Sequence, residues 1–132
     1  MKVCQFIDTY YPVVDGAINV SKYYADSVNK IEESALAAPK AAKKYQETDN
    51  FKVFRCFSVG APEKYRCGFP QIDRKFKKAL KNENFDILHA HSPYLLGRYA
   101  VKMGKKYKKP VVATLHTQYK ADFDRVLKGF KP

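Results

Sequence analysis

Two apolar runs in the second half of the chain each end in histidine, and the residues between them repeat with helical spacing. The runs are 85–91 (FDILHAH) and 110–116 (PVVATLH), and the stretch between them is 94–106. Short apolar runs of this kind are typical of buried strands, and the spacing between them is typical of an amphipathic helix. The pattern predicts a β-α-β unit whose parallel strands carry polar side chains at their carboxyl ends. In an open parallel sheet, ligands bind at that edge.

The rest of the chain continues this alternation of strands and helices. Two segments have strand composition and two have helical spacing: 2–7 and 51–59, and 20–31 and 71–82. Residues 34–38 favour a helix by propensity, but their place in the pattern and the proline after them favour a short strand. Glycines and prolines at 60–70 mark a long connection. We predict an α/β domain over 1–132, a Rossmann-like doubly wound parallel sheet with helices on both faces.

Each of the first two predicted helices has an apolar stripe that we expect to pack against the sheet. In the first helix the stripe consists of Val20, Tyr23, Tyr24, Ser27, Val28 and Ile31. In the second it consists of Ile72, Phe76, Ala79 and Leu80. The remaining positions are largely charged or polar, as on solvent-facing surfaces.

Composition indicates an ordinary globular core, because 45% of the residues are hydrophobic. The cysteines form no C-x-x-C pair, and Cys4 and Cys56 lie inside apolar runs. We therefore expect buried reduced thiols rather than a metal or redox site. No apolar run reaches the roughly 18 residues of a membrane span, and the first residues do not have the pattern of a signal peptide. We expect a cytoplasmic protein.

The chain is strongly basic, with a formal net charge of +12. Its lysines and arginines concentrate in three clusters, at 40–44, 74–81 and 102–109. Basic side chains on outer helix faces are commonly just solvated surface. A field of this size nevertheless favours anionic partners, such as acidic lipid headgroups, nucleic acid or phosphorylated substrates.

Gly16 follows the first predicted strand and precedes the first predicted helix. A residue without Cβ lets a phosphate approach the backbone amides and the positive end of the helix. The segment is neither a G-x-G-x-x-G fingerprint nor a Walker loop, because no second glycine follows nearby. On this evidence alone, a glycine that simply makes a turn is the simpler interpretation.

The three histidines allow more than one interpretation. His89 and His91 share one face of a strand, and with His116 they could supply three nitrogens to a metal ion. No carboxylate ligand lies next to them, so we favour a structural hydrogen bond for His89 and ligand contacts for His91 and His116. Ser92 lacks the glycines of a nucleophile elbow.

Carboxylates paired for hydrolysis are also hard to find. Only Asp8 and Asp15 lie at expected strand ends, and Asp8 is expected to bind amides of the loop that follows it.

Three motifs in order give the chain a family resemblance. They are 2–12 (KVCQFIDTYYP) leading to Asp15 and Gly16, then 85–93 (FDILHAHSP), then 111–117 (VVATLHT). Together they closely resemble the N-terminal domain of GT-B fold, retaining glycosyltransferases of the family-4 type. The resemblance is greatest to bacterial enzymes that glycosylate lipids such as diacylglycerol or phosphatidylinositol.

The resemblance implies a role for each matching residue. His116 would be catalytic by hydrogen-bonding the transferred sugar near the reacting carbon, and Gly16 with Asp15 would contact the donor diphosphate. Acceptor or sugar contacts would come from Tyr10, Tyr11, His91, Ser92 and Thr117. No metal and no cofactor are implied, because the nucleotide-diphosphate sugar is a co-substrate. Positioned hydrogen bonds and a paired leaving diphosphate would carry the chemistry.

The resemblance also implies that a C-terminal nucleotide-sugar-binding domain is absent from these 132 residues. We therefore expect a truncated, acceptor-side part of an enzyme that transfers a hexose to a lipid or glycan at the inner face of the cell membrane. It would have little activity alone and would self-associate through its unpaired sheet edge. An anionic membrane surface is expected as a partner, and nucleic acid is not. The alternative is a non-catalytic basic α/β module that binds anionic membrane or nucleic acid, with a metal-dependent hydrolase ranked below both.

Overall fold

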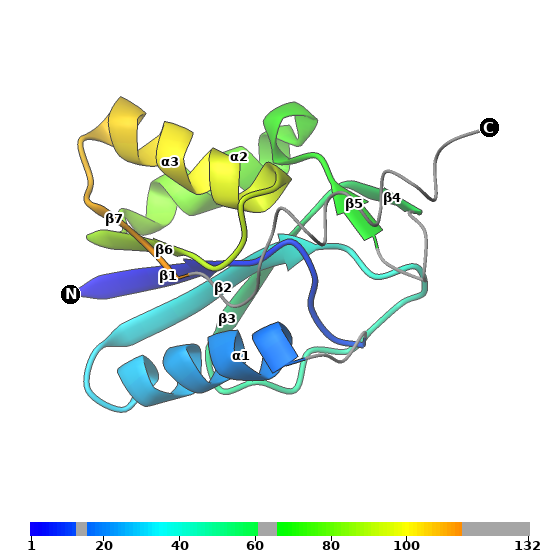
Figure 1. Cartoon of the computed structure of the whole chain (residues 1–132), viewed down its shortest axis with the longest axis horizontal. Coiled ribbons are helices and arrows are strands. Elements are labelled where there is room, and N and C mark those ends of the chain that lie inside the picture. The colour runs from blue at the N-terminus through cyan, green and yellow to red at the C-terminus, as the bar shows by residue number, and fades with distance from the viewer. Residues whose placement is uncertain (13–15, 61–65, 115–132) are drawn as a thin grey trace.

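The computed structural model describes residues 1–12, 16–60 and 66–114, and Figure 1 shows a parallel sheet between helical layers. In chain order the elements are β1 (Lys2–Phe6), α1 (Gly16–Asn29), β2 (Glu33–Pro39), β3 (Lys52–Cys56), β4 (Ser58–Gly60), β5 (Arg66–Gly68), the 3-10 turn η2 (Pro70–Ile72), α2 (Arg74–Glu83), β6 (Ile87–Ala90), α3 (Leu95–Tyr107) and β7 (Val111–Ala113).

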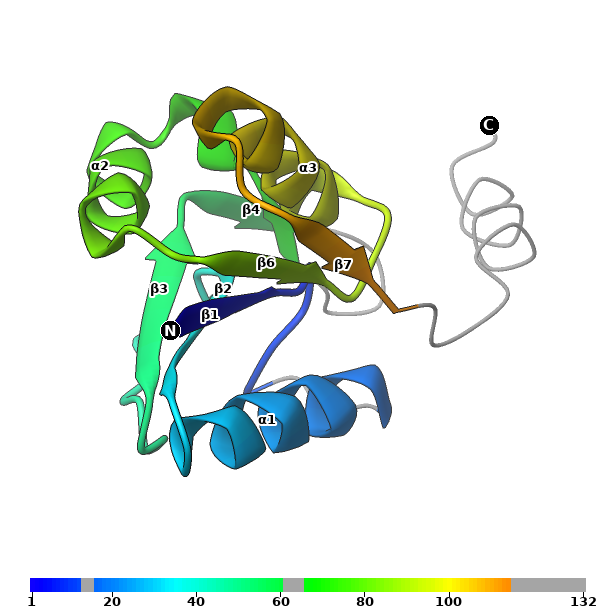
Figure 2. The same ribbon diagram turned by 90° about the vertical axis from the view of Figure 1, so that its left-hand side faces the viewer.

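The main sheet has five strands in the order β3-β2-β1-β6-β7, and every pair in it is parallel. Figure 2 shows α1 on one face and α2 with α3 on the other. This is the doubly wound, Rossmann-like arrangement predicted from the sequence. The strand at 34–38 and the helix at 94–106 are confirmed as β2 and α3.

Apolar side chains form one core on each face of the sheet. Phe76, Leu80, Leu88 and Leu96 belong to the core under α2 and α3, whereas Ile7, Ile18 and Leu36 belong to the core under α1. Cys4 and Cys56 are fully buried and reduced, as expected. Burial raises the pKa of the Cys56 thiol to about 12, so that thiol stays protonated at neutral pH.

The predicted sheet-facing stripe of α1 is wrong. The helix buries Ile18, Ser21 and Ala25 instead, whereas Tyr23 is 71% exposed and Ile31 is 82% exposed. Ser21 and Ala25 are small, which lets the helix lie close to β1 and β2. Burying the Ser21 hydroxyl costs little, because it donates to the backbone oxygen of Ile18 at 2.9 Å. The larger apolar residues are left on the flank of the helix.

The predicted strand at 51–59 is two strands. It breaks at Phe57, whose backbone N–H donates to Asp73 at 2.8 Å instead of continuing the sheet. The residues beyond it form β4, which pairs antiparallel with β5 inside the predicted long connection. Asp73 also accepts from Phe76 N at 3.0 Å and so caps α2. The helix therefore starts later than predicted, and Ile72 is exposed rather than part of the apolar stripe.

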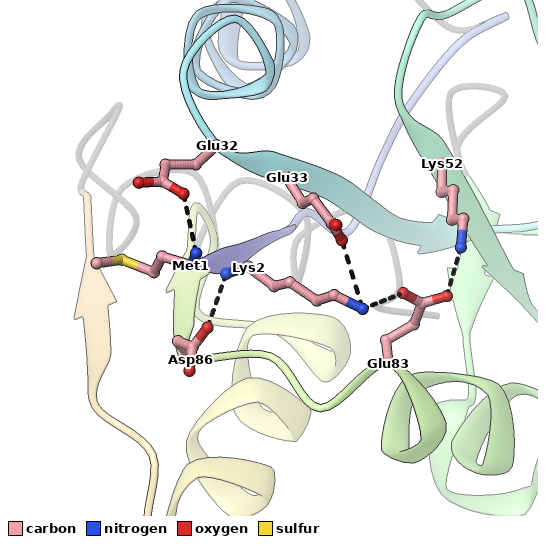
Figure 3. A network of polar contacts seen from close by, with 7 residues as sticks. All are labelled: Met1, Lys2, Glu32, Glu33, Lys52, Glu83 and Asp86. Carbon is pink, nitrogen blue, oxygen red and sulfur yellow. Dashed lines mark hydrogen bonds and ion pairs between the residues drawn. The ribbon is translucent and has the colours of Figure 1, made fainter.

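Exposed ion pairs join the amino ends of the strands (Figure 3). Glu83 lies 2.8 Å from Lys52 and 3.5 Å from Lys2, and the Lys52 ammonium lowers the pKa of the Glu83 carboxyl. The N-terminal amine pairs with Glu32 at 2.8 Å, and the Lys2 backbone N–H donates to Asp86 at 2.8 Å. Surface pairs of this kind add little to stability, so this edge is held mainly by strand pairing.

Candidate active site at the carboxyl edge of the sheet

The described members of the predicted site lie near the carboxyl ends of adjacent strands. β6 lies between β1 and β7, with Gln5 beside His89 and His89 beside Val112. The described residues that follow these strands, 7–12, 91–94 and Thr114, therefore share one edge. Gly16 begins α1 at the same end of the sheet (Figure 1). Asp15, His116 and Thr117 lie outside the described residues.

Asp8 joins the end of β1 to the start of α3. Its carboxylate accepts from the Leu96 backbone N–H at 2.7 Å and from the Ser92 hydroxyl, and its own N–H donates to Ser92 Oγ at 3.1 Å. The backbone N–H groups of Tyr94 and Gly97 also donate hydrogen bonds to the Asp8 carboxylate. Tyr94, at the N-cap position, makes no side-chain cap, so Asp8 caps α3 from another part of the chain. Its bonds to these amides differ from the local loop contacts that we expected.

The environment of Asp8 balances two opposing effects. Burial raises the pKa of its carboxyl group, because a charge removed from water is less stable. The hydrogen bonds from Ser92 and the amides act in the opposite direction and offset part of that effect. The carboxylate is therefore committed to holding Ser92 and α3 in place.

Gly97 brings α3 into close contact with the segment before it. A Cβ at this position would lie 1.6 Å from the Ser92 carbonyl oxygen, so only glycine fits. Together with Asp8, it fixes the segment containing Ser92 and Tyr94 at the rim of the site. The predicted sugar contact of Ser92 stays a prediction, and its hydroxyl is already engaged by Asp8.

His89 and His91 lie inside the protein, beneath α1. His91 is fully buried, with Nε2 in hydrogen-bonding contact with Gln5 Oε1 and its backbone N–H donating to Phe6 at 2.9 Å. The two imidazole ring centres are 4.1 Å apart, and Tyr24 covers both. The predicted ligand contact of His91 stays a prediction, and any such contact would need access to a side chain that is packed here.

His89 makes the structural hydrogen bond that we expected. Its Nε2 and the Thr114 hydroxyl are 2.6 Å apart. Thr114 lies just after β7 and two residues before His116 in the sequence. His89 therefore holds the end of β7 in place through Thr114. No group of three His, Cys, Asp or Glu side chains suited to a metal ion occurs within 1–12, 16–60 and 66–114.

Tyr10 and Tyr11 differ in how far they reach the surface. Tyr10 is only 3% exposed and donates to Asp49 at 2.8 Å, and burial raises the pKa of its hydroxyl. Tyr11 is half-buried and donates to Asn19 on α1 at 2.6 Å. Their rings meet edge to face, with centres 5.1 Å apart. Tyr10 therefore anchors this loop, and Tyr11 is the better placed of the two to meet a ligand.

The fold itself does not require glycine at position 16. A Cβ added to Gly16 would meet no atom of the described residues within 4 Å, and its backbone is not left-handed. Gly16 lies in the first turn of α1, where the helix dipole favours an anion. The phosphate contact of Gly16 stays a prediction.

Sequence reasoning missed Arg55, which holds several parts of this edge together. Its guanidinium donates to Glu47 at 2.7 Å, to the Pro39 carbonyl oxygen at 2.9 Å and to the Tyr11 carbonyl oxygen at 2.7 Å. A lone arginine within an apolar strand pattern resembles an ordinary solvent-facing position. The sequence signal that could have found it is the neighbouring segment 45–49, where Tyr45, Glu47 and Asp49 can surround a buried guanidinium.

The strand order and the parallel pairing define a Rossmann-like α/β domain. A family model described as Glycosyltransferase Family 4 matches residues 17–131. The chain belongs to this glycosyltransferase family, as its motifs indicated.

Two curated relatives are similar over most of the chain. One is an alpha-monoglucosyldiacylglycerol synthase of Streptococcus pneumoniae, 27% identical over 98% of this chain. The other is an alpha-monoglucosyldiacylglycerol synthase of Acholeplasma laidlawii, 24% identical over 90% of this chain. The chain spans 30% of the length of each relative.

Replacing Asp8 tests its capping role. Asp8→Ala leaves buried amides at the start of α3 without an acceptor, so we expect it to lower the free energy of unfolding by about 2–4 kcal/mol. Asp8→Asn keeps one acceptor oxygen and should cost less. Chemical denaturation of the whole reading-frame product measures both. Equal stability of the Asp8→Ala variant and the parent protein would contradict the role.

Proposed function

We propose that the chain is the acceptor-side part of an enzyme that transfers a hexose from a nucleotide-diphosphate sugar to a lipid or glycan, with retained anomeric configuration. Membership of the glycosyltransferase family supports the reaction class. The observation that carries the proposal is the place of Gly16, at the positive end of α1 and on the carboxyl edge of the sheet. A leaving diphosphate needs such a position, because negative charge develops on it during transfer.

In the proposed reaction, the bond between the anomeric carbon and the diphosphate oxygen breaks. A bond from an acceptor hydroxyl oxygen to that carbon forms, and the hydroxyl proton is released. Gly16 and Asp15 line the diphosphate position, and His116 hydrogen-bonds the sugar as positive charge develops on it. Tyr11 and Thr117 contribute contacts to the sugar or acceptor. The contacts of Asp8, Tyr10 and Arg55 at the described part of this edge support the proposal, because positioning contributes strongly to such catalysis.

A lipid acceptor at an anionic membrane surface is the favoured version of this proposal. The names of both relatives indicate glycolipid synthesis. In addition, a groove of about 450 Å³ lies between α2 and α3, and lysines line it: Lys77, Lys78, Lys81, Lys102 and Lys106. Lysines near a membrane surface attract anionic headgroups. None of the described helices is long and apolar enough to cross a membrane.

The same groove favours the second candidate function, a basic module that binds anionic membrane without catalysis. The two candidates differ in their dependence on the sugar donor. A transferase converts nucleotide sugar in a manner that depends on residues at the carboxyl edge of the sheet. A docking module binds vesicles in a salt-dependent manner, irrespective of nucleotide sugar.

The role of His116 is tested with the product of the whole reading frame that contains this chain. We expect His116→Ala to lower kcat at least about 100-fold with diacylglycerol and a panel of nucleotide sugars, since it removes a bond made in the transition state. Transfer of radiolabelled sugar into lipid measures the rate. Full activity of the variant would reject the role, and absence of transfer by the parent protein would favour the docking module.

Gly16 offers a test that separates binding from folding. Gly16→Ala has room for its methyl group, so we expect the free energy of unfolding to stay within about 1 kcal/mol of the parent. The methyl group would occupy the space proposed for the diphosphate, so KM for the nucleotide sugar should rise about tenfold or more. Steady-state kinetics and denaturation measure the two effects. An unchanged KM would count against a diphosphate at this position.

The lysine groove is tested by vesicle binding. We expect a fourfold Lys→Gln variant at 77, 81, 102 and 106 to bind phosphatidylglycerol vesicles at least about tenfold more weakly than the parent protein. The matched control carries four Lys→Gln changes at 30, 40, 43 and 44, which remove the same charge elsewhere. Sedimentation at two salt concentrations measures binding. Equal losses in both variants would show that net charge, rather than the groove, attracts the membrane.

A further inference from the structure

Arg55 connects segments from three neighbouring strands at the carboxyl edge of the sheet. It lies near the end of β3, beside Ala38 of β2. Its guanidinium reaches past the end of β2 to the loop that follows β1, where it donates to Tyr11 O at 2.7 Å. Because β2 lies between β1 and β3, this bond connects segments of two strands that are not neighbours in the sheet.

The guanidinium is held on its edges and lies close to aromatic rings. Its other two bonds go to Glu47 and to Pro39 O, at 2.7 and 2.9 Å. The rings of Tyr10 and Tyr45 lie 5.2 and 5.4 Å from its central carbon. Only 12% of the arginine side chain is exposed. Lysine has neither the planar fork nor the fixed spacing of donors that this arrangement uses.

The loop held by Arg55 leads directly to the proposed diphosphate position. Tyr11 is also bonded to Asn19 on α1, at 2.6 Å. Tyr10 is bonded to Asp49, which pairs with Lys22 on α1 at 2.9 Å. The backbone at Tyr11 is thus fixed relative to the first half of α1, and Gly16 begins that helix. A shift of this backbone would move groups that bind the donor, and small misplacements of this kind are costly in catalysis.

We propose that Arg55 is a positioning residue for the donor site: by holding the carbonyl of Tyr11, it sets the position of Tyr11 relative to α1, the helix that Gly16 begins. This inference rests on the proposed transferase function. It does not require Arg55 to touch the substrate. Its consequence is that replacing Arg55 changes donor affinity more than turnover.

The experiment compares Arg55→Lys with the parent protein, both made as the product of the whole reading frame. We expect KM for the nucleotide sugar to rise about tenfold or more, with kcat within about threefold, because the donor groups are displaced while the reacting groups remain. Glu47→Gln, which weakens one of the three bonds, should give a smaller rise in KM. Lys52→Met is the matched control on the same strand, since it removes an exposed ion pair at the opposite edge.

Hydrogen exchange gives a second readout that does not depend on activity. We expect the amides of 8–11 to exchange about tenfold faster in Arg55→Lys, with no change at 88–90 in β6. A folded Arg55→Lys variant with parental KM and parental exchange would overturn the inference. A loss of kcat alone, in proportion to the folded fraction, would reduce Arg55 to an ordinary stabilising residue and would also overturn it.

The result also separates this inference from the proposed function. If the parent protein transfers no sugar, the proposed function fails, and the donor-affinity role of Arg55 fails with it. If the parent protein is active and the Arg55→Lys variant is indistinguishable from it, only the inference fails.

Discussion

One half-buried carboxylate, that of Asp8, connects the end of the central strand β1 to the start of α3. Strand β1 is the middle strand, and its carboxyl end is where a doubly wound sheet opens to ligands. Asp8 uses its oxygens on the Ser92 hydroxyl and on the start of α3, and Gly97 lets the two segments touch. Without an acceptor there, the first turn of α3 would bury unpaired N–H groups. The position of the whole rim of the site depends on this contact.

The two edges of the sheet are stabilised in different ways. At the amino edge, the lysine and glutamate side chains pair at the surface of the molecule, and their pairing adds little. At the carboxyl edge, Asp8, Tyr10 and Arg55 are mostly removed from water and fully engaged with backbone groups or partner side chains. Buried polar contacts of this kind are costly to leave unsatisfied, so they specify one arrangement. The edge that carries the site is therefore the more rigidly defined of the two.

The sequence predicts the sheet better than it predicts the side-chain contacts. The strand at 34–38 could be predicted against its helical propensity, because the alternation of elements left room only for a strand. The flank of α1 could not be distinguished from its buried face, since both repeat with helical spacing and the sheet selects small residues such as Ser21 and Ala25. The break at Phe57 depends on Asp73, and the cap of α3 depends on Asp8, more than 80 positions away. Contacts between residues so far apart along the chain leave no local pattern in the sequence.

At the candidate site, too, some features could be predicted from the sequence and others could not. The helix that begins at Gly16 and the strands β6 and β7 could be predicted from the order of the motifs, whereas the roles of Gly16, His91 and His116 stay predictions. Arg55 was not identifiable, because its role arises only when the strand order places β3 two strands from β1. The packing of His91 beneath Tyr24 was equally invisible, because it follows from the way α1 is turned.

That orientation of α1 gives the described part of the molecule two unlike surfaces. Tyr23 on α1 and Ile31 just after it are exposed. Helix α1 lies on the opposite face of the sheet from α2 and α3 (Figure 2), which carry the lysines of the groove. Added salt screens attraction to the lysine surface, whereas salts such as sulfate strengthen contacts between apolar side chains. Ionic strength therefore acts on the two surfaces in opposite directions. The salt dependence of a contact therefore distinguishes one made by the lysine surface from one made by the apolar side chains, without any substitution.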